Sequence, residues 1–104
     1  MADTRVEHTD LLSVLLKGSL AQKKAILDTL DERQVDFIRD LIFNFLNNFP
    51  ISKADQNKLN KKKGLKNIAN SKRSNKYRKR LIKQHKKHII SLLDRYRDQL
   101  MTLI

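Results

Sequence analysis

The amino-acid sequence predicts an all-α protein: a small helical bundle with an N-terminal helical hairpin and a long C-terminal helix that is basic and amphipathic. The chain has 104 residues, of which only 2 are glycine and 1 is proline, whereas an all-β fold needs many turns. Its apolar residues recur at the three- and four-residue spacing of helices. Because a chain of this length builds one core, we predict a single domain with a flexible N-terminus at 1–9, an apolar hairpin region at 10–50 and a basic helical region at 51–104.

Capping residues delimit the first helical segments. Residues 10–17 form a short apolar segment, and the Gly18 that follows is a residue type that commonly ends helices. Ser19 predicts the start of the next helix, because Gln22 three residues later completes a capping box. The sequence therefore predicts a second helix over 20–30.

The most apolar helix is predicted over 32–47. Asp31 can cap its first turn, with Gln34 at the third position, and Pro50 prevents its continuation. We expect this helix to form a hydrophobic hairpin with 20–30 and to pack on the C-terminal half of the long helix. Its apolar stripe consists of Val35, Ile38, Leu41, Ile42, Phe45, Leu46 and Phe49, widened by Phe37 and Phe43.

The second half of the chain has fewer apolar residues before its last helix. Ser52 with Asp55 predicts a helix start, and Gly64 is expected to break or kink the stretch that follows. Ser74 is expected to cap one long helix of roughly 28 residues, about 42 Å in length. Part of so long a helix should project from the domain or pair with another chain. Its stripe consists of Ile82, His85, Ile89, Leu92, Tyr96, Leu100 and Leu103.

Charge divides the sequence into two unlike halves. The chain has 23 basic and 11 acidic residues, a formal net charge of +12. Residues 1–52 hold 6 basic and 8 acidic residues, a net of −2, whereas residues 53–104 hold 17 and 3, a net of +14. Residues 53–87, here called the basic block, contain 15 basic residues and a single acid, Asp55. This asymmetry predicts an electrostatic partner for one half only, and nucleic acid, an anionic membrane surface and an acidic protein all satisfy the charge.

The basic block is the candidate binding site. Its Lys and Arg side chains can neutralise phosphates, and the Asn and Ser residues between them can donate hydrogen bonds to phosphate oxygens. No regular recognition face is obvious in it, so we predict binding with little sequence specificity. Two clusters, Lys61–Lys63 and Lys72–Arg80, also match the pattern of a nuclear localisation signal. The residues predicted to bind nucleic acid are Lys61, Lys62, Lys63, Lys72, Arg73, Arg78, Lys79, Arg80, Lys83, Lys86 and Lys87.

Three ring side chains in or beside the basic block each have two interpretations. Tyr77 can stack on a base, or it can pack at the edge of the core beside Leu81. His85 and His88 lie three residues apart and could present two imidazoles to a metal ion. Because the Lys and Arg residues around them would repel a cation, we predict instead that they form the polar edge of the apolar stripe. The sequence thus predicts no metal and no cofactor.

The sequence contains no pattern typical of catalysis. A glycine-rich phosphate loop, a nucleophile with its base and paired carboxylates in an apolar setting are all lacking, so we expect no enzymatic activity. The sequence has no cysteine, so we expect no disulfides. It also shows no apolar run of about 20 residues and no secretory signal, so we expect neither a membrane-spanning helix nor secretion. The acidic residues of the first half are expected to cap helices, to face solvent or to contact the basic half; they include Asp28, Asp31, Glu32, Asp36 and Asp40.

The amphipathic segment 88–104 has three interpretations, which are core packing, self-association and binding to a membrane surface. We expect them in that order.

The order of several short segments resembles a known family. The segments are two apolar pairs, a Phe-Pro turn, a Lys-rich element and a basic stretch that ends in Gln. In chain order they are Phe37-Ile38, Phe49-Pro50-Ile51-Ser52, Leu59-x-Lys61-x-Lys63, Ile68-Ala69 and Lys79-Arg80-Leu81-Ile82-x-Gln84. The pattern covers 11–93 and resembles small basic proteins of adenovirus-like and polinton-type viral elements of animals, which have been likened to minor core proteins that accompany packaged DNA. Those proteins continue with a Gly-rich apolar tail, whereas this chain continues with a charged amphipathic segment.

This resemblance implies a viral protein of the virion core or the host nucleus, and it alone favours duplex DNA over RNA. We therefore expect a non-enzymatic protein that binds nucleic acid by neutralising phosphates, with self-association through the C-terminal helix as a further interaction. The alternative is a protein-interaction or scaffold module whose amphipathic helices bind an acidic or helical partner. A chain that is not viral is expected in the nucleus or the cytoplasm.

Overall fold

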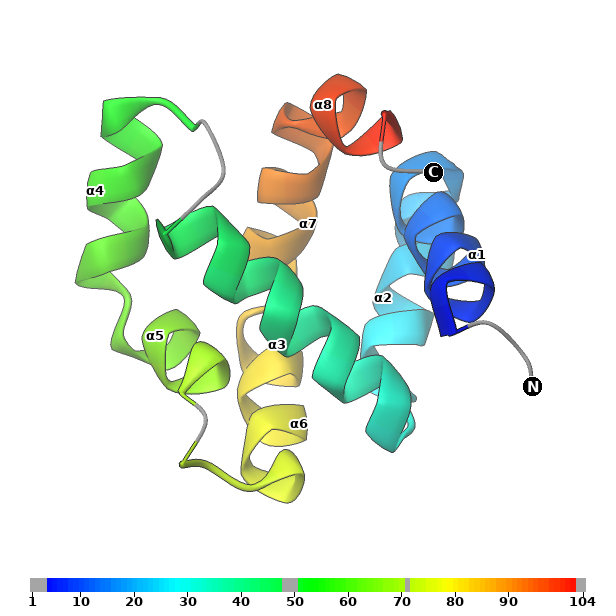
Figure 1. Ribbon diagram of the computed structural model, residues 1–104, viewed down its shortest axis with the longest axis horizontal. Coiled ribbons are helices and arrows are strands. Elements are labelled where there is room, and N and C mark those ends of the chain that lie inside the picture. Colours follow the sequence, from blue (N-terminus) through cyan, green and yellow to red (C-terminus); the bar gives the residue numbers. More distant parts are fainter. Residues whose placement is uncertain (1–3, 48–50, 71, 103–104) are drawn as a thin grey trace. The chain divides into compact units, whose positions relative to one another are not determined.

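The computed structural model describes residues 4–47, 51–70 and 72–102, with side chains from residue 10 onward. Within these residues the chain forms eight α-helices and no strand (Figure 1), which confirms the prediction of an all-α protein. The helices separate into two compact units, of which unit 1 contains Met1–Thr29 and Lys86–Ile104, and unit 2 contains Leu30–His85. Where the sequence predicts a single domain, unit 2 is thus a continuous segment inserted into unit 1.

Unit 1 is built from four helices: α1 (Thr4–Lys17), α2 (Leu20–Asp28), α7 (Lys86–Arg95) and α8 (Arg97–Met101). Helices α1 and α2 lie side by side (Figure 1), α7 packs on both of them, and α8 packs on α1 and α7. Most of the described apolar side chains of the C-terminal segment are therefore buried, as the core-packing interpretation predicts. The buried residues include Leu12, Leu15, Leu16, Leu27, Ile89, Ile90, Leu92, Leu93, Tyr96 and Leu100.

The turn between α1 and α2 follows the predicted capping pattern. The backbone N–H of Gln22 donates to Ser19 Oγ at 3.2 Å, and the backbone N–H of Ser19 donates to Gln22 Oε1 at 2.8 Å. Gly18 follows the end of α1, where a Cβ atom would lie 2.6 Å from the carbonyl oxygen of Val14, so the close approach requires glycine. Helix α1 begins at Thr4, however, so most of the segment expected to be flexible is helical.

Unit 2 is built from α3 (Glu32–Asn47), α4 (Lys53–Lys61), α5 (Lys63–Ala69) and α6 (Asn75–Gln84). Helix α3 packs on the other three, and α5 also contacts α4 and α6. In Figure 1, α3 runs across α6 and past α5. The predicted stripe of α3 supplies much of the core, in which the buried apolar residues are Leu30, Val35, Ile38, Leu41, Ile42, Phe45, Leu59, Leu65, Ile68, Leu81 and Ile82. Phe49, at the end of that stripe, lies outside the described residues.

The helix starts in unit 2 also agree with the predicted caps. The backbone N–H of Gln34 donates to Asp31 Oδ1 at 2.8 Å, and the N–H of Asp31 donates to Gln34 Oε1 at 2.9 Å. Ser52 caps α4 through the backbone N–H of Asp55 at 3.2 Å. Side-chain oxygens thus satisfy backbone donors that the first turn of a helix leaves without intrahelical partners.

Two predictions about helix arrangement have different outcomes. The hairpin of 20–30 and 32–47 is not confirmed, because α2 belongs to unit 1 and α3 to unit 2. The single long helix is instead three helices, interrupted at His85 and at Tyr96, where the backbone leaves helical geometry with ψ of 16° and 22°. The apolar stripe that suggested one helix serves two cores: its part on α6 faces unit 2, and its part on α7 and α8 faces unit 1. Leu103, the last predicted member, lies outside the described residues.

Candidate nucleic-acid interface

Positive charge is concentrated in unit 2. Leu30–His85 holds 15 basic and 5 acidic residues, a net of +10, whereas the two segments of unit 1 hold 8 and 6, a net of +2. Four of the five acids of unit 2 lie on α3 or just before it, and the fifth, Asp55 on α4, is buried. Among the described residues, α4, α5, α6 and the turn before α6 therefore expose basic side chains without an exposed acid between them.

Helix α6 presents a regular cationic stripe. Lys76, Arg80 and Lys83 are all exposed, and their spacing of four and three residues places them on one face of the helix, along about 10 Å of its axis. The opposite face is buried through Leu81 and Ile82. This face was not predicted from the sequence, and Lys76 is not among the residues predicted to bind nucleic acid. Predicting this face requires knowing which face of α6 is buried. The few apolar residues of so short a helix do not define that face until its packing is known.

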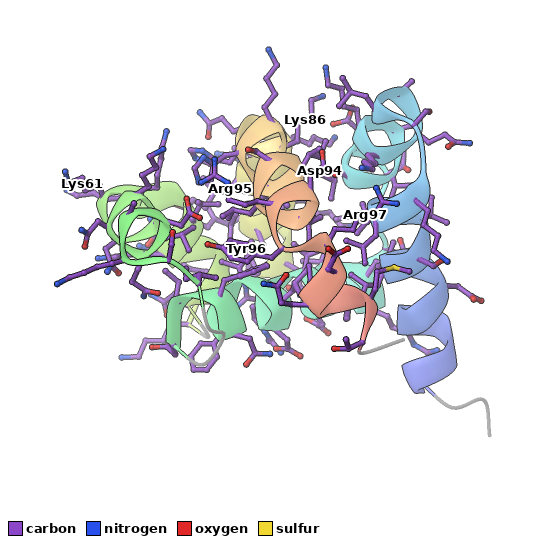
Figure 2. All side chains as sticks on the ribbon, turned by 90° about the horizontal axis from the view of Figure 1, so that it is seen from above. Lys61, Lys86, Asp94, Arg95, Tyr96 and Arg97 are labelled. Carbon is purple, nitrogen blue, oxygen red and sulfur yellow. The ribbon has the colours of Figure 1, made fainter. Side chains whose placement is uncertain are left out.

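The α4–α5 junction adds a second group of exposed cations. The predicted residues Lys61, Lys62 and Lys63 are all exposed, and Lys61 extends away from the ribbon of α4 (Figure 2). Lys62 itself separates the two helices, since it is the C-cap of α4 and the N-cap of α5. The predicted break therefore lies two residues before Gly64, which is inside α5. Three further exposed lysines outside the predicted set, Lys53, Lys58 and Lys66, lie on the same helices.

The turn between α5 and α6 carries the exposed pair Lys72 and Arg73. The backbone N–H of Lys72 donates to Asn70 Oδ1 at 3.0 Å, and that of Arg73 donates to the Asn70 carbonyl at 3.2 Å. Ser74 then caps α6, as predicted, by accepting from the backbone N–H of Tyr77 at 3.2 Å. The Arg73 guanidinium lies 5.1 Å from the centroid of the Tyr77 ring, which is half-buried. This cation–π contact orients the guanidinium at the surface.

Arg78 does not belong to the exposed surface, which corrects the prediction that it contacts phosphate. Its side chain is 3% exposed, and Nε donates to the Ile68 carbonyl at 2.9 Å while the two terminal nitrogens donate to Asn75 Oδ1 and to the Asn70 carbonyl. These acceptors include carbonyls at the C-terminal end of α5, which lack intrahelical partners. Burial lowers the pKa of Arg78 below its ordinary value, and the nearby positive charge of Arg39 acts in the same direction. The residue holds α5 and the following turn against α6.

One edge of α6 faces the acidic residues of α3. Lys79 Nζ lies 3.7 Å from Glu32 Oε1, and Asn75 Nδ2 donates to Glu32 at 2.7 Å and to Asp36 at 3.2 Å. The expectation that acids of the first half contact the basic half is confirmed at these positions. Lys79 is therefore partly neutralised within unit 2, which separates it from the exposed stripe of Lys76, Arg80 and Lys83.

The last two predicted residues lie in unit 1. Lys86 Nζ is 3.0 Å from Asp28 Oδ2, and its side chain is mostly buried. Lys87 is exposed. In Figure 2, Lys86 is labelled on α7, to which both residues belong. The structure thus groups nine of the eleven predicted residues in unit 2, and eight of those nine, all except Arg78, have side chains that reach the surface.

His85 has a packing role at the end of α6. A Cβ atom on Gly64 would lie 2.0 Å from His85 Nε2, so the imidazole occupies the space that a larger residue in α5 would need. Burial lowers the pKa of His85 below its ordinary value of 6.5, and the charge of Lys62 lowers it further. Across the described part of the chain, no three His, Cys, Asp or Glu side chains come together as a metal site would require.

Within the same residues, no helix is long and apolar enough to cross a membrane. Comparison of the chain with protein-family models, curated proteins and solved structures found no match.

Proposed function

We propose that the chain is a non-enzymatic nucleic-acid-binding protein that neutralises phosphate charge through exposed basic side chains of unit 2. The observation that carries this proposal is the stripe of Lys76, Arg80 and Lys83 on a unit with a net charge of +10. Lys and Arg side chains that neutralise phosphates release condensed counterions, and this release supplies most of the affinity of non-specific binding. The exposed cations of α4 and α5 extend the surface.

The composition of this surface supports low sequence specificity. Most of its exposed cations are lysines, whose ammonium groups act as point charges rather than as planar forks that pair with base edges. Phosphate contacts fix position on the nucleic acid but carry no sequence information. The proposed mechanism is therefore charge neutralisation, and a role in condensing DNA in a viral core follows only if the resemblance to viral core proteins is correct.

An interaction module for a helical partner is the competing function, and the packing of unit 1 argues against it. The apolar faces of α7 and α8 are buried against the other helices of their own unit, so they are not free to receive a partner helix. An acidic protein would still satisfy the charge of unit 2. Binding to an acidic protein would weaken with salt much as binding to nucleic acid does. An experiment that distinguishes the two partners must therefore compare different ligands as well as different salt concentrations.

A gel-shift titration of the whole chain tests the proposal. Duplex DNA, duplex RNA and single strands of equal length are compared at two salt concentrations, with polyglutamate as the acidic-protein mimic. Salt-sensitive binding to nucleic acid, with similar affinity for unrelated sequences, is the expected result. Binding to polyglutamate alone would favour the interaction module. Duplex RNA that binds as tightly as duplex DNA would remove the preference for DNA that the resemblance implies.

A further inference from the structure

A shallow hollow of about 500 Å³ lies on the surface of unit 2, where α3 meets the C-terminal end of α5. Its lining residues are Arg39, Asp40, Phe43, Ala69 and Asn70. Phe43 is 48% exposed although it belongs to the most apolar helix of the chain, because it lies outside the buried stripe of α3. The hollow therefore offers a partly exposed aromatic ring.

Hydrogen bonds fix the wall of the hollow beside the cationic turn. The side-chain oxygen of Asn70 accepts from the backbone N–H of Lys72, and the Asn70 carbonyl accepts from Arg73 and from the buried Arg78. The wall is thus the start of the turn that exposes Lys72 and Arg73. A ligand with an anionic group on the turn could place an adjoining planar group in the hollow.

The charged groups of the hollow are already paired with one another. Arg39 donates to Asp40 Oδ1 through Nε at 3.1 Å and through Nη2 at 3.0 Å, and it lies 3.8 Å from Asp36. The carboxylate of Asp40 would repel a phosphate placed here, whereas a neutral planar group would meet the aromatic ring, the small Ala69 side chain and the polar groups of the other lining residues. This surface therefore offers two neighbouring places to a nucleotide, the cationic turn for its phosphate and the hollow for its base.

We propose that the hollow at Phe43 holds one unpaired base of a single-stranded nucleic acid whose phosphates contact Lys72 and Arg73. The inference rests on the proposed function and names the form of nucleic acid that unit 2 prefers. Stacking of a base on an aromatic side chain tolerates any base, because every base has a π-face. A base inside a duplex is already stacked and paired, and would have to be extruded to reach the ring. Single strands should therefore bind better than duplexes that offer the same phosphates.

A matched pair of single strands tests this proposal. The ligands are an oligothymidylate and an abasic oligodeoxynucleotide of equal length, which carry the same phosphate charge and differ in their bases. The wild-type chain should bind oligothymidylate about 5- to 150-fold more tightly. Phe43→Ala should abolish this preference and leave the affinity for the abasic strand unchanged. Leu20→Ala, which truncates another exposed apolar side chain (57%) in unit 1, is the control and should keep the preference.

Fluorescence gives a readout at the hollow itself. The chain has no tryptophan, so Phe43→Trp introduces a single indole where the base is proposed to stack. Oligothymidylate should quench this tryptophan, and the abasic strand should not. Equal quenching by both strands, or equal wild-type affinity for both, would overturn the base site while leaving salt-dependent nucleic-acid binding intact. Failure of both strands and of duplex DNA to bind at low salt would overturn the proposed function together with the base site.

Discussion

Arg78 and Arg80 are two residues apart and chemically identical, yet the structure gives them opposite roles. The Arg78 guanidinium is buried and donates to Ile68, Asn70 and Asn75, whereas Arg80 is exposed on the stripe of α6. We predict that Arg78→Gln strongly destabilises unit 2 and that Arg80→Gln does not. The reverse holds for phosphate binding, where only Arg80→Gln should act directly.

The magnitude follows from the contacts of Arg78. A hydrogen bond to a charged group contributes about 1.5–3 kcal/mol, and a buried acceptor left without a donor carries a further penalty. Because Gln can replace at most part of the three interactions, Arg78→Gln should lower the free energy of unfolding by about 3–5 kcal/mol. Arg78→Lys should recover only part of this loss, since an ammonium lacks the planar fork that reaches several acceptors. Arg80→Gln should change stability by less than about 0.5 kcal/mol.

Urea denaturation followed by far-ultraviolet circular dichroism measures these differences. The expected order of stability is wild type and Arg80→Gln together, then Arg78→Lys, then Arg78→Gln. A loss below about 1 kcal/mol for Arg78→Gln would refute the reasoning, because a surface substitution has an effect of that size or smaller. An equal loss for both Gln variants would show that the two arginines do not differ in burial.

Three further predictions concern the packing of unit 2. Phe45 is 2% exposed, so Phe45→Ala should lower the free energy of unfolding by about 3–5 kcal/mol in a thermal melt, and no change would mean that α3 is not the core. Gly64→Ala should destabilise by about 1–3 kcal/mol in urea, because the new Cβ displaces the His85 ring; a more stable variant would show that the ring moves freely. The lowered pKa of His85 means that the unfolded chain binds the proton first as pH falls below 6.5. The stability of the wild type should therefore fall as the pH drops through 6.5, and the stability of His85→Asn should fall less over the same range; an equal decline would exclude His85 as its source.

The starts of α2, α3, α4 and α6 were predicted from the sequence because their capping signals are local. Ser19 with Gln22 and Asp31 with Gln34 make capping boxes within four residues, and both are present in the structure. The apolar stripe of the helix over 32–47 was equally local, since each of its buried members lies within three residues of the next. Neither signal depends on the rest of the fold.

The helix breaks and the pairing of helices depend on distant contacts and could not be predicted in this way. The apolar pattern continues through His85 without interruption, yet the residues before it belong to unit 2 and those after it to unit 1. The backbone leaves helical geometry at His85, where the segment that belongs to unit 2 ends and the segment that belongs to unit 1 begins. Histidine at position 85 does not indicate a helix break in the way that proline or glycine would.

The candidate site shows the same division between local and distant information. The sequence located the excess of charge correctly, because a count of residues suffices for that. Arg78 was predicted to contact phosphate, yet it is buried and donates hydrogen bonds to carbonyls at the end of α5. Lys76 was not predicted to do so, yet it is exposed on the same face as Arg80 and Lys83. The difference between these residues lies in which face of α6 packs on α3 and α5, and charge alone does not reveal it.

The salt dependence of duplex binding tests the central claim, phosphate neutralisation by unit 2, most directly. The whole chain, binding six to eight phosphates, should show a slope of log K against log salt concentration of about −5 to −7. Lys76→Gln, Arg80→Gln and Lys83→Gln combined should make this slope shallower by about 2 to 3 and weaken two unrelated duplexes alike. The matched control removes the same charge from unit 1 through Lys17→Gln, Lys24→Gln and Arg97→Gln, and should leave the slope unchanged. A wild-type slope near zero, or an equal reduction by both triple variants, would contradict the account.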